Sequence, residues 1–145
     1  MRIAPALLEE AFTAFRACGQ GRRECVGYYT GPLAEPELAD AFVHPEHGAG
    51  RGGYEIDRRW LTRFWLDLYR EQRAIRMQLH THPRQAFHSQ TDDEFPAVHT
   101  PGFLSLVIPD FAEGEATLER CALYELDEHG DWRRCEPVER LELAR

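Results

Sequence analysis

The 145-residue sequence lacks any long hydrophobic run, and no apolar stretch approaches the roughly 20 residues that a transmembrane helix needs. The first twelve residues, MRIAPALLEEAF, carry acids where a signal peptide has its apolar centre, so we expect no export signal. Lysine is also missing: all 17 basic residues are arginine, and 25 acidic residues leave a formal net charge of −8. Without a dense basic surface, a nonspecific nucleic-acid role is disfavoured. These absences predict a cytoplasmic protein that binds neither membrane nor nucleic acid.

Cysteine is scarce and follows no known metal or disulfide spacing. Its four positions are Cys18, Cys25, Cys121 and Cys135. With no CxxC pair, we expect reduced thiols, several of them core residues, although a disulfide between two of them remains open. The glycines of segment 48–53 match neither a GxGxxG nor a Walker pattern, so phosphate binding is not supported. We interpret His44 and His47, just before them, as solvated loop histidines rather than metal ligands.

The composition is that of one globular domain spanning residues 1–145. Hydrophobic residues make up 43% and charged residues 29% of the chain, which argues against disorder. A chain of this length is large enough to bury a core. No internal repeat is visible.

Hydrophobic periodicity predicts two helices. The first, 5–18, begins at a proline and has an apolar face of Leu7, Leu8, Ala11, Phe12 and Phe15. The second, 57–69, begins at Asp57 as the N-cap. Its apolar stripe is predicted to be a core face and consists of Trp60, Leu61, Phe64, Trp65, Leu68 and Tyr69.

Strands are predicted for most of the remaining chain. Their ranges are 24–31, 38–43, 75–80, 102–109, 118–126, 132–138 and 141–143, with a hairpin turn at 127–131. Segment 44–53 reads as a mobile loop, and a short helix is predicted near 89–94. This order of helices and strands predicts a layered fold of the α/β or α+β class.

The run His80-Thr81-His82-Pro83 carries the clearest chemical signal. Side chains two apart on a strand point to the same face, and Pro83 ends the ladder, so His80 and His82 project together at a strand end. Two imidazoles so placed suit one metal ion, and the carboxylate of Asp92 is a third ligand within reach. Two nitrogens and a carboxylate favour Zn²⁺ with an open fourth position. The alternative is a pair of exposed histidines followed by an ordinary N-cap, Ser89-x-x-Asp92.

A metal-activated water needs a proton acceptor, and Glu24 is our candidate. It is an ionisable residue at the head of an otherwise apolar and aromatic strand. An exposed acid at a strand end is the alternative interpretation. The sequence around it, Glu-Cys-Val-Gly-Tyr-Tyr-Thr-Gly, favours Glu24 as the proton acceptor.

Taken together, these motifs resemble the JAMM (JAB1/MPN) metalloproteases. The family pattern combines a glutamate opening an ExxGxxxG-like strand, a distant H-[ST]-H-P, and S-x-x-D. The matching positions are Glu24, Gly27 and Gly31, then His80 to Pro83, then Ser89 and Asp92. The resemblance covers residues 5 to about 108. Here the segment between His82 and Ser89 is one residue shorter than usual. Because Asp93 directly follows Asp92, either carboxylate is a possible ligand, and the S-x-x-D spacing favours Asp92.

The resemblance implies a fold and an activity. The fold is a JAB1/MPN-like, cytidine-deaminase-like layered structure with a mixed central sheet flanked by helices. The activity is zinc-dependent (iso)peptide cleavage after the C-terminal glycine of ubiquitin or a ubiquitin-like modifier, as in a deubiquitinase. His80, His82 and Asp92 would hold Zn²⁺, Glu24 would be the general base, and Ser89 would stabilise the oxyanion.

The resemblance also implies partners. Compact bacterial members occur beside E1-like and E2-like proteins, for example in antiviral conjugation systems, or beside sulfur-carrier proteins. The substrate is therefore either a ubiquitin-like protein in its conjugates or the precursor of a ubiquitin-fold sulfur carrier. A non-catalytic scaffold of the same fold is the non-enzyme alternative. An amidohydrolase barrel would need a longer chain, and a deaminase would need HxE and PCxxC motifs, which are absent.

Overall fold

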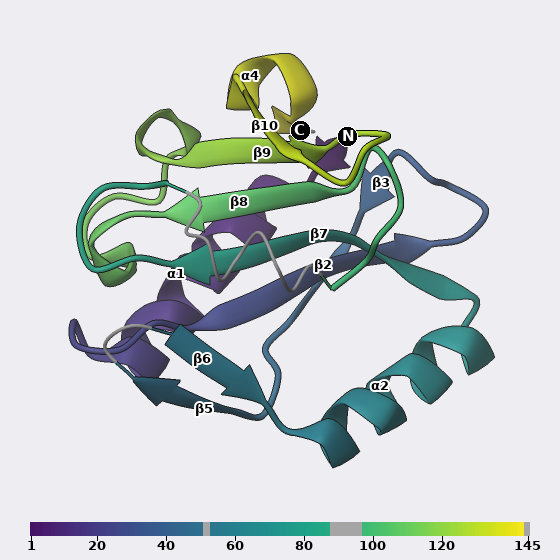
Figure 1. Ribbon diagram of the computed structural model, residues 1–145, viewed down its shortest axis with the longest axis horizontal. Helices are drawn as coiled ribbons and strands as arrows, with labels where there is room; N and C mark the ends of the chain where they lie inside the picture. Colours follow the sequence, from purple (N-terminus) through teal and green to yellow (C-terminus); the bar gives the residue numbers. More distant parts are fainter. Residues whose placement is uncertain (51–52, 88–96, 144–145) are drawn as a thin grey trace.

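A computed structural model describes residues 1–50, 53–87 and 97–143 of the chain. Its centre is a mixed six-stranded sheet of order β10-β9-β8-β7-β2-β4 (Figure 1). In chain order these strands are β2 (Val26–Pro32), β4 (Ala41–Val43), β7 (Arg73–Thr81), β8 (Leu104–Ile108), β9 (Ala122–Leu126) and β10 (Trp132–Cys135). Strands β7 and β8 are parallel, and the other neighbours are antiparallel. The predicted mixed sheet flanked by helices is confirmed.

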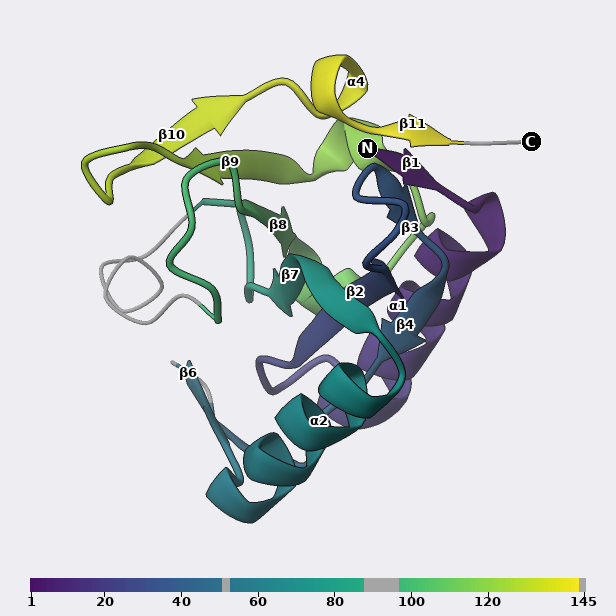
Figure 2. The ribbon, with the colours of Figure 1, turned by 90° about the vertical axis from the view of Figure 1, so that its right-hand side faces the viewer.

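Helices α1 (Pro5–Gly19) and α2 (Arg58–Arg70) lie on opposite sides of this sheet (Figure 2). Side chains alternate along a strand, so β2 contributes to two separate cores. Tyr29 belongs to the core beneath α1, whereas Tyr28 belongs to the core beneath α2, where its ring stacks on Phe64 with centroids 5.7 Å apart. The sheet therefore has two buried faces.

The observed range of α1 agrees with the predicted range to within one residue. Its apolar face is buried, and the chain leaves the helix at Gln20, whose φ of 49° is left-handed. The second helix is capped as predicted, because the Asp57 carboxylate accepts a hydrogen bond of 2.8 Å from the Trp60 amide. Both helices thus begin where the sequence indicates.

The predicted core stripe of α2 is only partly correct. Phe64 and Leu68 are buried, but Trp65 and Tyr69 are 43% and 76% exposed. Positions 65 and 69 lie about 100° around the helix from positions 64 and 68. The helix covers the sheet with a narrow stripe, so these two aromatic side chains face away from it.

The predicted strand 38–43 is divided between two sheets. Strand β3 (Leu38–Ala39) joins β1 (Arg2–Ile3) and β11 (Glu142–Leu143) in a parallel sheet of order β11-β1-β3, while β4 pairs with β2 in the main sheet. Asp40 lies between the two pieces, where its carboxylate pairs with Arg73. The expected final strand near 141–143 is confirmed as β11.

Segment 44–53 was expected to be a loop, and the structure shows a hairpin instead. Strands β5 (His47–Gly50) and β6 (Gly53–Ile56) form a separate two-stranded antiparallel sheet. Glycines occur both where two backbones pair closely and in irregular loops. The glycine-rich sequence alone therefore does not distinguish a hairpin from a loop.

The C-terminal third matches the predicted hairpin only near its turn. Strands β9 and β10 flank residues 127–131 as expected, but both strands are shorter than predicted. The ends are helical instead: η2 (Leu118–Arg120) starts after Thr117, and α4 (Pro137–Arg140) starts at a proline, which suits a first helical turn. A further one-turn helix, η1 (Asp110–Ala112), follows β8. The predicted helix near 89–94 lies outside the described residues. No helix in the described ranges is long and apolar enough to span a bilayer.

Candidate functional site

His80 and His82 lie side by side at the end of β7, buried within the protein. Their side chains are 1% and 4% exposed, and their ring centroids are 5.2 Å apart. Strand alternation directs both rings to the face of the sheet that α2 covers, while Thr81 between them points to the other face. The alternative of two exposed histidines at a strand end is therefore wrong.

The backbone of His82 is held after the regular strand has ended. Its amide donates to the carbonyl of Ile108 at 2.9 Å, and its carbonyl accepts from the amide of Phe111 at 2.8 Å. Pro83 follows and stops the ladder, as predicted. The second histidine is thus positioned by the end of β8 and by the η1 turn.

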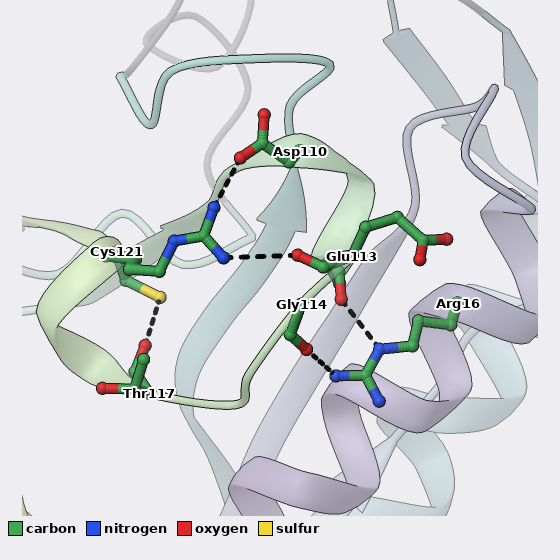
Figure 3. A network of polar contacts seen from close by, with 8 residues as sticks. Arg16, Asp110, Glu113, Gly114, Thr117 and Cys121 are labelled. Atoms are coloured by element: carbon green, nitrogen blue, oxygen red, sulfur yellow. Dashed lines mark hydrogen bonds and ion pairs between the residues drawn. The ribbon is translucent and has the colours of Figure 1, made fainter.

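The η1 turn is unusual because three consecutive residues without glycine are left-handed. Asp110, Phe111 and Ala112 have φ values of 53°, 54° and 64°, a conformation that costs about 1–2 kcal/mol per residue. Two arginines bind the turn (Figure 3). Arg120 donates to the Asp110 carboxylate at 2.6 Å, and Arg16 of α1 donates to the Ala112 carbonyl at 2.9 Å and to the Gly114 carbonyl. These bonds offset the strain of the turn that holds His82.

Glu24 lies two residues before β2. Val26 is the partner of His80, the last pair of the β2–β7 ladder. Beyond it, the Thr81 amide donates to the Cys25 carbonyl at 3.0 Å, and the Cys25 amide donates to the Thr81 hydroxyl at 2.9 Å. Continued by two residues, the same register would set Glu24 opposite His82, on the same face. The Glu24 side chain is buried, with 8% exposure, so the interpretation as an exposed acid is wrong.

Other described residues complete the surroundings of the histidines. Tyr54 of β6 lies 6.2 Å from His80 and Phe87 lies 4.7 Å from His82, measured between ring centroids. On the same face, buried Gln78 donates to the Ser105 hydroxyl at 3.1 Å and accepts from the Ala97 amide at 2.9 Å. The remaining predicted site residues, Ser89 and Asp92, lie outside the described residues, as does Asp93.

A separate group of cysteines and histidines, which the sequence analysis does not predict, could hold a metal ion. The ligand atoms of Cys18, Cys25, His44 and His47 all lie within 4.8 Å of one another. His47 is half-buried and its Nε2 lies 3.5 Å from Cys18 Sγ, so the interpretation as a solvated loop histidine does not hold for His47. The only sequence signals were the spacings Cys-x6-Cys and His-x2-His.

Burial changes the protonation of this group. It lowers the pKa of His44, and the neighbouring His47 lowers it further. It also raises the pKa of the Cys25 thiol well above its usual range, and the hydrogen bond with Cys18 adds to this shift. The four cysteines are all free thiols, as expected, and two of them, Cys25 and Cys121, are buried.

One known protein is similar in sequence over part of the chain. Over 72 residues, the chain is 40% identical to a protein of Sinorhizobium fredii (strain NBRC 101917 / NGR234) named "Probable metalloprotease y4jG". The match covers 50% of this chain and 44% of that protein, so this chain corresponds to less than half of its relative's length. No family model matches the chain.

Two solved structures share the fold. A protein of Desulfitobacterium hafniense, DSY2949, superposes with a TM-score of 0.67 at 15% identity, covering 99% of this chain and 92% of that one. A protein of Salinibacter ruber (strain DSM 13855) superposes with a TM-score of 0.60 at 17% identity, covering 93% and 88%. At these identities the likeness establishes the fold alone.

The sequence relative and the side chains agree on a broad class. A partial match to a probable metalloprotease and a Cys/His group able to hold a metal are both consistent with a metal-dependent hydrolase.

Proposed function

We propose that this chain is a JAMM-type zinc isopeptidase that cleaves after the C-terminal glycine of a ubiquitin-like modifier. The observation that carries the proposal is the burial of Glu24, His80 and His82 at the ends of two neighbouring strands. Glu24 lies two residues before β2, His80 lies in β7 and His82 directly follows β7, and all three are buried. Ionisable side chains buried together at one end of a sheet are candidates for a functional site.

The donor set fits zinc. Two buried imidazoles with centroids 5.2 Å apart supply neighbouring nitrogen ligands, and Asp92 is the proposed oxygen ligand. When bound, zinc supplies Lewis acidity, polarising a carbonyl and lowering the pKa of water toward ~7.

The protein residues carry the proton transfers. The Glu24 carboxylate takes a proton from the attacking water as the new C–O bond forms. It then delivers that proton to the departing amine as the C–N bond breaks, so the lysine leaves neutral. Ser89 donates a hydrogen bond to the developing oxyanion, a contact type worth about 2.7–4 kcal/mol in other hydrolases.

In this proposal the substrate's extended C-terminal tail binds along the β5–β6 hairpin. The β5–β6 hairpin is a separate two-stranded sheet, and its Tyr54 approaches His80. An extended peptide adds to such an edge through main-chain hydrogen bonds. The substrate that we favour is a ubiquitin-like protein conjugated to lysine. The alternative is the precursor of a ubiquitin-fold sulfur carrier, which would also be cleaved after a glycine.

The decisive experiment compares Glu24→Gln with the wild type on two substrates. One is a ubiquitin-like protein with a C-terminal extension, and the other is the same protein linked to a lysine side chain. The wild type should cleave at least one of them and stop when a chelator is added. Loss of the base should slow cleavage by about 10²–10⁴-fold with zinc retained. Glu128→Gln, an exposed acid in the β9–β10 turn, is the control.

A second variant tests the metal ligands. His82→Ala should lose the zinc of this site together with activity, whereas His129→Ala, an exposed histidine, should lose neither. Full activity of Glu24→Gln would remove Glu24 from the mechanism. A wild type that cleaves neither substrate and loses no metal on the His82→Ala substitution would favour the scaffold alternative.

A further inference from the structure

We propose that Cys18, Cys25, His44 and His47 form a second metal centre, a closed Cys₂His₂ zinc site that is structural rather than catalytic. Cys18 lies at the end of α1, Cys25 directly before β2, His44 directly after β4, and His47 is the first residue of β5. Two thiols and two imidazoles are the ligand set of many structural zinc sites. The proposal does not depend on the proposed isopeptidase activity.

One edge of the group has the length expected for tetrahedral coordination, and the distance between the two sulfur atoms is shorter than expected. With Zn–S of about 2.3 Å and Zn–N of about 2.0–2.1 Å, a tetrahedral S···N edge is about 3.6 Å. Cys18 Sγ and His47 Nε2 are 3.5 Å apart. The two sulfur atoms, Cys18 Sγ and Cys25 Sγ, are 2.6 Å apart, whereas the S···S edge would be about 3.8 Å. Zinc binding therefore requires the thiols to separate by about 1 Å.

The tautomer of His47 is set for metal binding. Its Nδ1 lies 2.8 Å from the carbonyl oxygen of Pro45. A carbonyl only accepts, so Nδ1 carries the hydrogen and Nε2 presents its lone pair toward Cys18. Metal-bound histidines commonly donate their second ring nitrogen to a carbonyl in this way.

The second imidazole is held in place by aromatic packing. The His44 ring lies against Phe42 with an interplanar angle of 24° and meets the edge of Phe15, with centroids 6.3 and 6.0 Å away. It stands almost perpendicular to His47 at 5.0 Å. Both imidazoles are thus oriented by neighbours that are not ligands.

The site is separate from the candidate active site but adjacent to it. Cys25 belongs to the core beneath α1, whereas its neighbour Val26 belongs to the core beneath α2. Strand alternation therefore places the Cys25 thiol on the face opposite Glu24 and the histidines of β7. Four protein ligands leave no position for water, so the site would join three segments and fix the start of β2, one residue from Glu24.

Cobalt distinguishes this site from the other metal site, because only a thiolate ligand gives a thiolate-to-cobalt charge-transfer band. The purified full chain should be stripped of metal, loaded with Co²⁺ and recorded in the near ultraviolet. We expect the band in the wild type and in His80→Ala/His82→Ala, and its loss in Cys18→Ser and His47→Ala. Cys135→Ser, which removes a half-buried thiol elsewhere, should keep the band.

Zinc analysis gives an independent measure. The His80→Ala/His82→Ala protein should retain about one zinc per chain, and adding Cys18→Ser should reduce it to background. Failure of the isopeptidase proposal would leave this result unchanged.

Alkylation of the wild type tests the site even if the cysteine variants do not fold. Zinc-bound Cys18 and Cys25 should resist alkylation until a chelator is added. If they instead resist until a reductant is added, they form a disulfide and the proposal is wrong. The same conclusion follows if the cobalt band is absent from the wild type or persists in both ligand variants.

Discussion

Gly27 and Gly31 of β2 occupy positions where neighbouring chains leave no room for a side chain. A Cβ at Gly27 would lie 2.5 Å from Cε2 of Phe42 and 3.0 Å from Cζ of Phe15. A Cβ at Gly31 would collide with the backbone carbonyl of Leu38. The two glycines of the ExxGxxxG-like strand thus have a packing reason, since they let β2 approach β4 and β3 closely.

We predict that Gly27→Ala and Gly31→Ala each lower the free energy of unfolding by about 1–3 kcal/mol. The larger loss is expected at Gly31, because a backbone carbonyl cannot turn aside as a ring can. Urea denaturation measures both. The control is Gly48→Ala, where the nearest atom would be 4.0 Å away and the change should stay within about 0.5 kcal/mol. Equal effects at all three positions would contradict this account.

At the scale of elements, the β9–β10 hairpin depends on the carboxylate of Asp127. It accepts hydrogen bonds from the amides of Asp131 and His129 and from Nε of Arg133 at 2.9, 2.8 and 2.6 Å. The Asp131 amide bond is the largest cause holding the pKa of Asp127 at about 2, and Arg133 lowers it further. The turn-forming sequence 127–131 therefore works through one ionised side chain.

This pKa predicts how the hairpin responds to acid. An unfolded aspartate titrates near ~3.9, so a folded pKa of about 2 means that ionisation stabilises the folded state above that range. The stabilisation is lost as the pH falls toward 2. Wild type should be more stable than Asp127→Asn at pH 7, and the gap should close with falling pH. Thermal unfolding across this range measures it, with Glu128→Gln as the control. A gap that stays constant would exclude the titration of Asp127 as its source.

At the scale of the whole molecule, Arg16 connects one layer of the fold to the site on the other face. It extends from α1 to the left-handed η1 turn, whose Phe111 amide holds the His82 carbonyl. The end of the histidine strand is thus supported by a helix that lies behind the sheet.

We predict that Arg16→Ala lowers the free energy of unfolding by about 1–3 kcal/mol, because two carbonyls lose their donor. Hydrogen exchange at the Phe111 amide should also become faster, since local opening of the turn needs less free energy. Arg22→Ala, an exposed arginine shortly after α1, is the matched control. An unchanged exchange rate at Phe111 would mean that the turn does not need Arg16.

Local signals explain which parts of the structure were predictable. The helix at 5–18 starts at a proline and the helix at 57–69 at the capping residue Asp57, and both have periodic apolar residues within their own ranges. That His80 and His82 point to the same face follows from strand alternation alone. The buried stripe on α2 is narrower than predicted, because the packing of the sheet against the helix decides which apolar positions are covered. The strand at 38–43 is divided because its halves pair with different partners, β1 and β2.

The Cys/His group shows the limit of such signals. Its four residues lie in three separate segments, and neither of its spacings belongs to a known pattern. Their convergence depends on how α1, β2 and β5 pack, which is a property of the folded chain.

The sequence by itself determined the helix ends, the order of the main strands and a candidate histidine pair, because capping and alternation act over a few neighbouring residues. Only the tertiary structure decided that Glu24 is buried and that two cysteines lie beside two histidines. The reason is that strand register and helix packing join residues that are far apart in the chain, and that choice is made by the whole core at once.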